Sequence, residues 1–101
     1  MTNIKVLKDS DKIANITVKG HANYSVIGKD IVCSSISSMI TVTINAILRL
    51  DDSAITYEVK EGYINILVKK HNLYIDTLLI NLIDLLQDLA NNYPKNVKII
   101  I

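Results

Sequence analysis

The only cysteine of the chain, Cys33, follows His21 after a short segment, and these two side chains can do chemistry together. A thiol becomes a strong nucleophile when it loses its proton, and an imidazole can take up that proton and return it later. If a helix begins after Asp30, Cys33 lies in its first turn, where unpaired backbone N–H groups and the helix dipole favour the thiolate. The N–H groups of Cys33 and Ser34 would then stabilise the negative oxygen of a tetrahedral intermediate. The pattern therefore indicates acyl transfer by a thiol.

The same residues also have interpretations without catalysis. Cys33 falls at the edge of an apolar helical stripe, where a cysteine commonly packs into a core. His21 can be a surface residue at the end of a strand, and Asp30 can be the helix N-cap. Ser37, one helical turn after Cys33, can contact the thiol but has no base of its own. The residues alone leave both interpretations open.

The glycines Gly20 and Gly28 bound a segment without periodicity, residues 20–29, which is longer than packing requires and is typical of a functional loop. The two glycines are too far apart for their amides to hold one phosphate. His21, Cys33 and His71 lack the tight spacing of zinc ligands, and the chain has no second thiol. We therefore expect no metal and no cofactor.

Hydrophobic periodicity predicts an α+β fold with the order ββαββαβ, in which two helices pack on a mainly antiparallel sheet. Alternation predicts two hairpins, one turning at residues 9–11 and the other at residues 60–62. The last strand, residues 97–101, is apolar enough to need cover on both faces.

Three-to-four-residue spacing of apolar side chains predicts the two helices. The first is capped by Asp30 and continues to Leu50, and the second is capped by Asn72 and ends before Pro94. Residues 31–48 carry no charge, but their many hydroxyl and amide groups argue against a membrane span. No membrane partner is expected.

The length predicts a single domain over residues 1–101. The chain has eleven basic and ten acidic side chains. Because no basic block is longer than Lys69-Lys70, we expect no direct contact with nucleic acid. With an apolar content of 50%, a small monomer would leave apolar side chains exposed to water, which predicts a homodimer. One cysteine and the lack of a signal-peptide pattern predict the cytoplasm.

The segment Gly20-His21-Ala22, followed by residues 28–37 (GKDIVCSSIS) and later Asn45, resembles the Prp family of ribosomal-processing cysteine proteases, also called YsxB-like. The resemblance covers nearly the whole chain. It implies a homodimeric cytoplasmic endopeptidase of bacteria, which removes a short N-terminal extension from large-subunit ribosomal protein twenty-seven by cutting after an aromatic residue. The rival hypothesis is a ribosome-associated dimer that binds a peptide without cutting it.

The resemblance also implies roles for individual residues. Cys33 matches the family's nucleophile and His21 its base, whereas no third residue that orients the base can be assigned. Gly20 and Gly28 match hinge glycines of a loop that moves to admit substrate. The remaining matches line the site: Asp30 and Ser37.

The chain departs from the family at Ser34-Ser35, where many relatives have alanine after the nucleophile. This change leaves Cys33 and His21 intact and alters the shape of a subsite, to which Ser34 is assigned. We expect the loop to be mobile without ligand, with His21 and Cys33 farther apart than a hydrogen bond.

Overall fold

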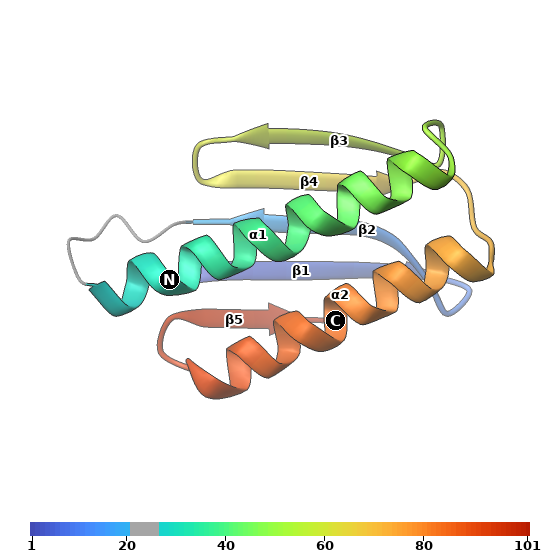
Figure 1. The fold of residues 1–101 in the computed structure, drawn as a ribbon. Coiled ribbons are helices and arrows are strands. Elements are labelled where there is room, and N and C mark those ends of the chain that lie inside the picture. The colour runs from blue at the N-terminus through green and yellow to red at the C-terminus, as the bar shows by residue number, and fades with distance from the viewer. Residues whose placement is uncertain (21–26) are drawn as a thin grey trace.

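The computed structural model describes residues 1–20 and 27–101, and for residues 27–30 it describes the backbone only. It confirms the predicted α+β fold and the order ββαββαβ (Figure 1). The elements are β1 (Thr2–Asp9), β2 (Lys12–Lys19), α1 (Ile27–Leu50), β3 (Ile55–Lys60), β4 (Tyr63–Val68), α2 (Leu73–Asn92) and β5 (Val97–Ile100).

The five strands form one sheet in the order β3-β4-β2-β1-β5. Both hairpins are antiparallel, and so is the pair of β2 and β4 that joins them. β5 returns beside β1 in the parallel direction, with Thr2 opposite Val97. The sheet is therefore mainly antiparallel, as predicted, with one parallel pair at its edge.

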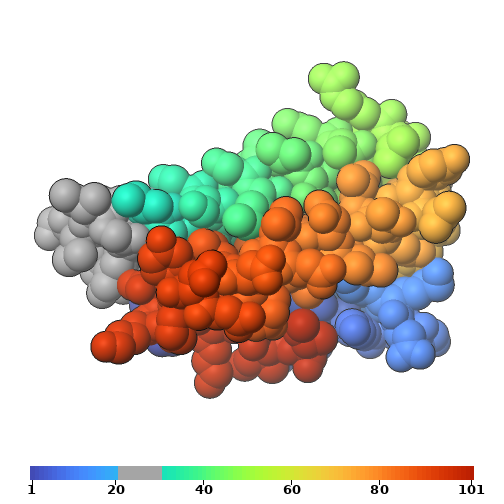
Figure 2. All heavy atoms as spheres, turned by 60° about the horizontal axis from the view of Figure 1, so that its bottom comes forward, coloured from blue at the N-terminus to red at the C-terminus, as the bar shows by residue number. Residues whose placement is uncertain are grey.

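The two helices lie side by side on one face of the sheet (Figures 1 and 2). Strand alternation turns every second side chain of β1 toward them, so that Ile4 and Val6 are buried while Asn3 and Lys5 are exposed. The helices complete the core with one apolar stripe each. The most deeply buried of these helix residues are Val32, Ile40, Ile47, Ile75, Leu79, Leu82 and Leu86.

Helix α1 begins at Ile27, so the prediction that Asp30 caps it was wrong. Asp30 lies inside the first turn, and Cys33 lies in the second turn instead of the first. The one weak helix former near this end, Gly28, costs only about 1 kcal/mol relative to alanine, and an acidic residue in a first turn is compatible with the helix dipole. A residue type that suits a cap therefore does not fix where a helix begins.

The last strand, β5, is covered on one face only, which contradicts the prediction of cover on both faces. Val97 points to the helices and is buried, whereas Ile100 points to the other face and is 50% exposed. Both helices lie on the same side of the sheet, so the apolar composition of this edge strand does not report two covered faces.

Within α1, the segment Ile31–Leu50 is long and apolar enough to cross a membrane by length and composition. Core helices pass the same test. In this structure the apolar stripe of the segment, including Val32, Ile36 and Ile40, packs into the core shared with the sheet.

Candidate active site

A cleft of about 230 Å³ opens at the end of the molecule where α1 begins, β2 ends and the β3–β4 hairpin turns. Figure 1 shows that these three parts of the chain gather at one end of the fold. Each contributes to the wall, and Thr2 completes it. The lining residues are Thr2, Val18, Gly20, Cys33, Ile36, Ser37 and residues 59–64.

Cys33 lies on the α1 wall of this cleft. Its neighbours Val32 and Ile36 are only 2% and 3% exposed, but Cys33 itself is half-buried. The side chain therefore lies at the boundary between the core and the cleft. A thiol in this position can meet a ligand in the cleft, which a thiol packed wholly within the core cannot do.

Gly20 closes the β2 side of the cleft and fixes the end of that strand. Its N–H donates a hydrogen bond to the carbonyl oxygen of Gly62, with an N···O distance of 3.0 Å. Its φ is +87°, and a Cβ at this position would overlap the carbonyl oxygen of Met1. Both observations require glycine here. His21 follows Gly20 in the chain and lies outside the described residues.

The other predicted site residues divide between the cleft and the rest of α1. Ser37 lines the cleft, one turn after Cys33, as the spacing predicted. Ser34 is exposed and is not among the described residues that line it. Gly28 and Asp30 lie in the first turn of α1, and only their backbone is described. The predictions that the loop is mobile and that His21 and Cys33 are separated without ligand concern residues outside the described ones.

Because Cys33 lies in the second turn of α1, the prediction that the N–H groups of Cys33 and Ser34 form an oxyanion hole was wrong. In the second turn, the N–H groups of Cys33 and Ser34 bond to the carbonyl oxygens four residues earlier in the helix. They are not the unpaired amides of a helix terminus. A developing oxyanion therefore needs donors other than these two amides.

The β3–β4 turn is the part of the site that sequence reasoning missed. Val59, Lys60 and Glu61 line the same cleft as Cys33, although they are far from it in the chain. The signal in the sequence was Gly62, whose φ of +71° marks a tight turn. That signal places a turn in the chain but does not place it beside α1.

Among the described residues, no group of three or more His, Cys, Asp or Glu side chains is arranged to hold a metal ion. The described walls offer the thiol of Cys33, apolar and hydroxyl-bearing side chains around it, and the charged Lys60 and Glu61 of the β3–β4 turn. A cysteine on an accessible cleft of this kind can form a covalent acyl intermediate.

The comparison with known families assigns the class. A family model described as cysteine protease Prp matches residues 1–98, so the chain is a cysteine protease. It belongs to the Prp family, as its motifs around His21 and Cys33 indicated.

Similar proteins are known in sequence and in structure. The ribosomal processing cysteine protease Prp of Staphylococcus aureus strain Mu50 is 27% identical over 100 residues, covering 92% of this chain and 91% of its own. The crystal structure of S. aureus Prp with a substrate peptide has a TM-score of 0.89 at 22% identity, covering 99% of this chain and 98% of that one. SMU.848 from Streptococcus mutans has a TM-score of 0.88 at 23% identity, covering 98% of this chain and 91% of that one. These structures share the fold of this chain.

Proposed function

We propose that this protease removes the N-terminal extension of bacterial large-subunit ribosomal protein twenty-seven. The support from relatives is that the S. aureus protein is named a ribosomal processing protease and binds a substrate peptide in one crystal structure. The observation in this chain that carries the proposal is the position of Cys33, half-buried on the wall of a cleft.

The proposed reaction uses Cys33 and His21 as a dyad. The Cys33 thiolate attacks the scissile carbonyl carbon, forming a C–S bond and moving the carbonyl electron pair onto oxygen. The intermediate collapses, the C–N bond breaks, and His21 in its imidazolium form protonates the leaving amine. Water then attacks the thioester while His21 accepts its proton, and the acid product leaves as Cys33 returns to the thiolate. A dyad suffices for these steps, with lower activity than a fully oriented triad.

The apolar part of the cleft supports cleavage after an aromatic residue. Val18, Ile36 and Val59 come from three different elements and line the same space as Cys33. An aromatic side chain gains most when it moves from water into such a space. Val59 is 60% exposed in the unliganded chain, so a substrate ring that covers it would bury new apolar surface.

We also propose that the enzyme acts as a homodimer in the cytoplasm. Large apolar side chains remain on the outside of both helices, among them Val42 at 68% and Leu73 at 76% exposure. A second copy would remove part of this surface from water.

The decisive experiment is mass spectrometry of an extension peptide incubated with the wild type, Cys33→Ala and His21→Ala. We expect a single cut after the aromatic residue with the wild type and no cut with either variant, and Ser38→Ala, exposed on α1, serves as the active control. Cleavage that survives Cys33→Ala overturns the protease mechanism. Peptide binding without cleavage by the wild type would instead identify the non-catalytic dimer.

Thiol labelling gives an independent prediction. Iodoacetamide should modify Cys33 readily in the wild type and more slowly in His21→Ala, because in the proposed dyad His21 accepts the proton of the thiol. The modified residue is identified by peptide mapping. Slow labelling at every pH in both proteins would show a thiol that is not activated.

A further inference from the structure

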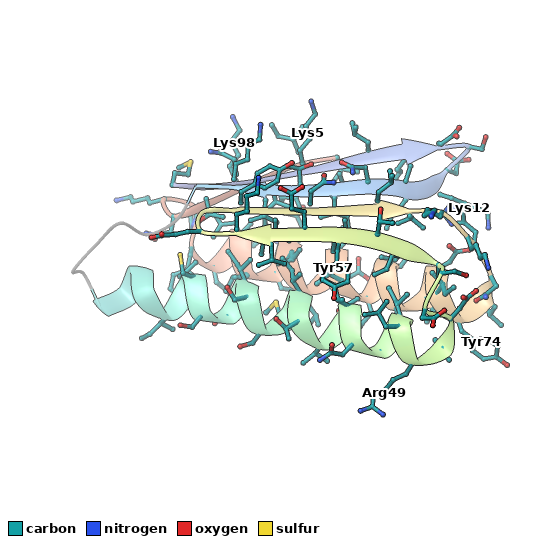
Figure 3. All side chains as sticks on the ribbon, turned by 90° about the horizontal axis from the view of Figure 1, so that it is seen from above. Lys5, Lys12, Arg49, Tyr57, Tyr74 and Lys98 are labelled. Carbon is teal, nitrogen blue, oxygen red and sulfur yellow. The ribbon has the colours of Figure 1, made fainter. Side chains whose placement is uncertain are left out.

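The face of the sheet opposite the helices collects lysines that are distant in the sequence. The strand register places Lys19 of β2 and Lys98 of β5 on either side of Asn3 of β1. Lys5 is two residues further along β1 and therefore lies on the same face. Figure 3 shows Lys5 and Lys98 pointing away from both helices. We call Lys5, Lys19 and Lys98 the lysine triad.

The triad is compact. Neighbouring strands lie about 4.8 Å apart and residues advance about 3.3 Å along a strand, so the three Cα atoms are roughly 8 to 10 Å from one another. This separation is about one Debye length at physiological salt. All three side chains are exposed, and none forms an ion pair within residues 1–20 and 31–101. Three like charges at this spacing repel one another until an anion lies between them.

No acidic side chain on this face neutralises the triad. Two acidic strand residues lie on the open face: Glu58 of the far edge strand β3, which pairs with Lys60 at 2.6 Å, and Asp9 at the end of β1, four residues beyond Lys5. The middle of the face is neutral and polar: Asn15 and Thr17 of β2 are both hydrogen-bonded to Asn65 of β4 at 3.0 Å. The open face therefore has a net positive charge.

Helix α2 has the opposite charge. It contains three aspartates, Asp76, Asp84 and Asp88, and neither lysine nor arginine. The formal net charge of +1 is therefore unevenly distributed, with the three lysines of the triad on the open sheet face and three aspartates on α2. The sequence has no basic block longer than Lys69-Lys70, but strand pairing brings together three lysines that are distant in the chain.

We propose that the lysine triad binds the phosphate backbone of RNA. This inference rests on the proposed function, because the proposed substrate is a ribosomal protein and ribosomal proteins bind RNA. Three separate ammonium groups suit a chain of phosphates, each of which takes one cation, although the face beside them carries the exposed apolar Leu7 and Ile100 as well as the hydrogen-bonded Asn15 and Thr17. Lys19 also lies beside Tyr63 of β4 in the register, which puts an aromatic ring next to the triad, where a base can stack.

The test is the fluorescence anisotropy of a labelled single-stranded oligouridylate titrated with the full chain. Neutralising three phosphates predicts a plot of log affinity against log salt with a slope of about −2. Lys19→Glu and Lys98→Glu should each weaken binding by roughly fivefold or more at low salt. Arg49→Glu is the matched control, because it makes the same charge change on α1, where Figure 3 shows the side chain pointing away from the sheet. It should change affinity less than about twofold.

Three outcomes would overturn the inference. Equal weakening by Arg49→Glu would show that only net charge matters. Competition by polyglutamate as strong as that by RNA would show that the face accepts acidic protein. No binding of RNA at low salt would show that the triad is not a docking surface.

The proposed function is tested separately from this inference. The triad lies outside the described cleft lining, so the triad variants should cut a short extension peptide at the wild-type rate. If the wild type cuts the peptide but does not bind RNA, only the inference about the triad fails. If the wild type binds RNA but does not cut the peptide, only the proposed function fails.

Discussion

Cys33 lies at the boundary between the core and the cleft, and a shift of one position along α1 separates a buried side chain from one that lines the cleft. The adjacent Val32 is buried in the stripe that α1 turns toward the sheet, while Cys33 is rotated far enough around the helix to reach the cleft wall. Its position in the second turn removes the strongest effect of the helix terminus, which acts within the first turn. In the proposed mechanism, activation of the thiol therefore depends more on His21 than on the helix terminus.

Gly20 gives a prediction at the same scale. Gly20→Ala should lower the free energy of unfolding by about 2 to 3 kcal/mol, because alanine is strained at this φ and its Cβ meets the carbonyl of Met1. Urea denaturation measures the change. Asparagine tolerates a positive φ but still carries a Cβ, so Gly20→Asn should be nearly as harmful, whereas Gly62→Asn should be mild. Full stability of Gly20→Asn would contradict the close approach.

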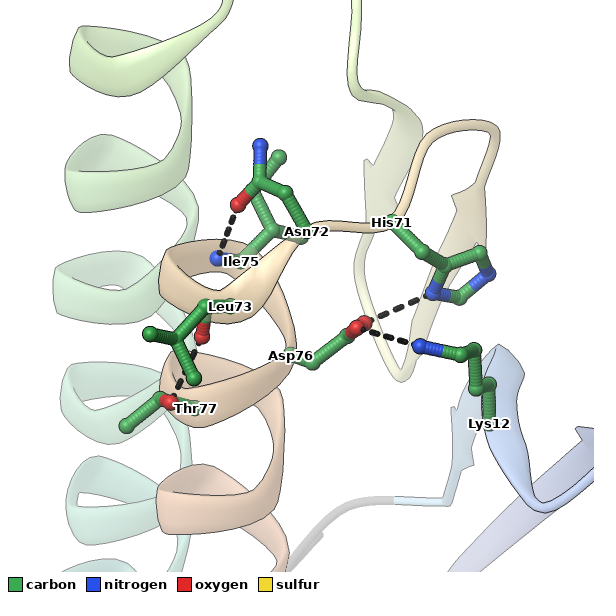
Figure 4. Close-up of polar contacts among 7 residues, drawn as sticks. All are labelled: Lys12, His71, Asn72, Leu73, Ile75, Asp76 and Thr77. Atoms are coloured by element: carbon green, nitrogen blue, oxygen red, sulfur yellow. Dashed lines mark hydrogen bonds and ion pairs between the residues drawn. The ribbon is translucent and has the colours of Figure 1, made fainter.

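Between elements, one carboxylate of α2 links the helix to the start of β2. Asp76, in the first turn of α2, lies 3.0 Å from Lys12 Nζ and 2.7 Å from His71 Nδ1 (Figure 4). Partial burial raises the pKa of Asp76, but the hydrogen bonds from His71 and Lys12 outweigh it, and the pKa is lowered from its usual 3.8. The ionised form is therefore favoured by folding.

The stability that Asp76 contributes should depend on pH. A carboxyl whose pKa is lowered by folding stabilises the fold above its unfolded pKa and loses that effect as the pH falls through its folded pKa. Asp76→Asn should cost about 1 kcal/mol at pH 7, and the difference from the wild type should shrink as the pH falls below the usual pKa of an aspartate carboxyl. Urea denaturation at neutral and at acidic pH tests this. Asp84→Asn, exposed on the same helix, should cost little at either pH.

At the scale of the whole molecule, the strand order decides which residues line the candidate active site. The hairpins, both helices and the residues Cys33 and Ser37 could be predicted from local patterns, because alternation, spacing and capping act over a few residues. The order β3-β4-β2-β1-β5 could not, since it depends on which strands pair after collapse. The β3–β4 turn and the lysine triad were hidden for this reason. The start of α1 was misplaced because Asp30 suits both a cap and a first turn.

The proposed dimer gives a prediction at this scale. Leu50 at the end of α1 and Leu73 and Tyr74 at the start of α2 line a hollow of about 370 Å³, and all three are more than half exposed. If a second copy covers them, Leu73→Glu should raise the dimer dissociation constant by about tenfold or more, because it buries a charge in an apolar contact. Analytical ultracentrifugation over a range of concentrations measures this. Leu85→Glu, elsewhere on α2, should leave the dimer dissociation constant unchanged. If Leu73→Glu also leaves it unchanged, the hollow is not the dimer contact.

The parallel pairing of β5 with β1 has a consequence for synthesis. β1 emerges from the ribosome before every other strand, yet its outer backbone groups find their partner only when residues 97–100 have been made. Until then an extended edge with unsatisfied amides and carbonyls is available to any neighbouring nascent chain. Translation that stalls shortly before Val97 should therefore yield aggregates, and rapid completion should spare the chain from them.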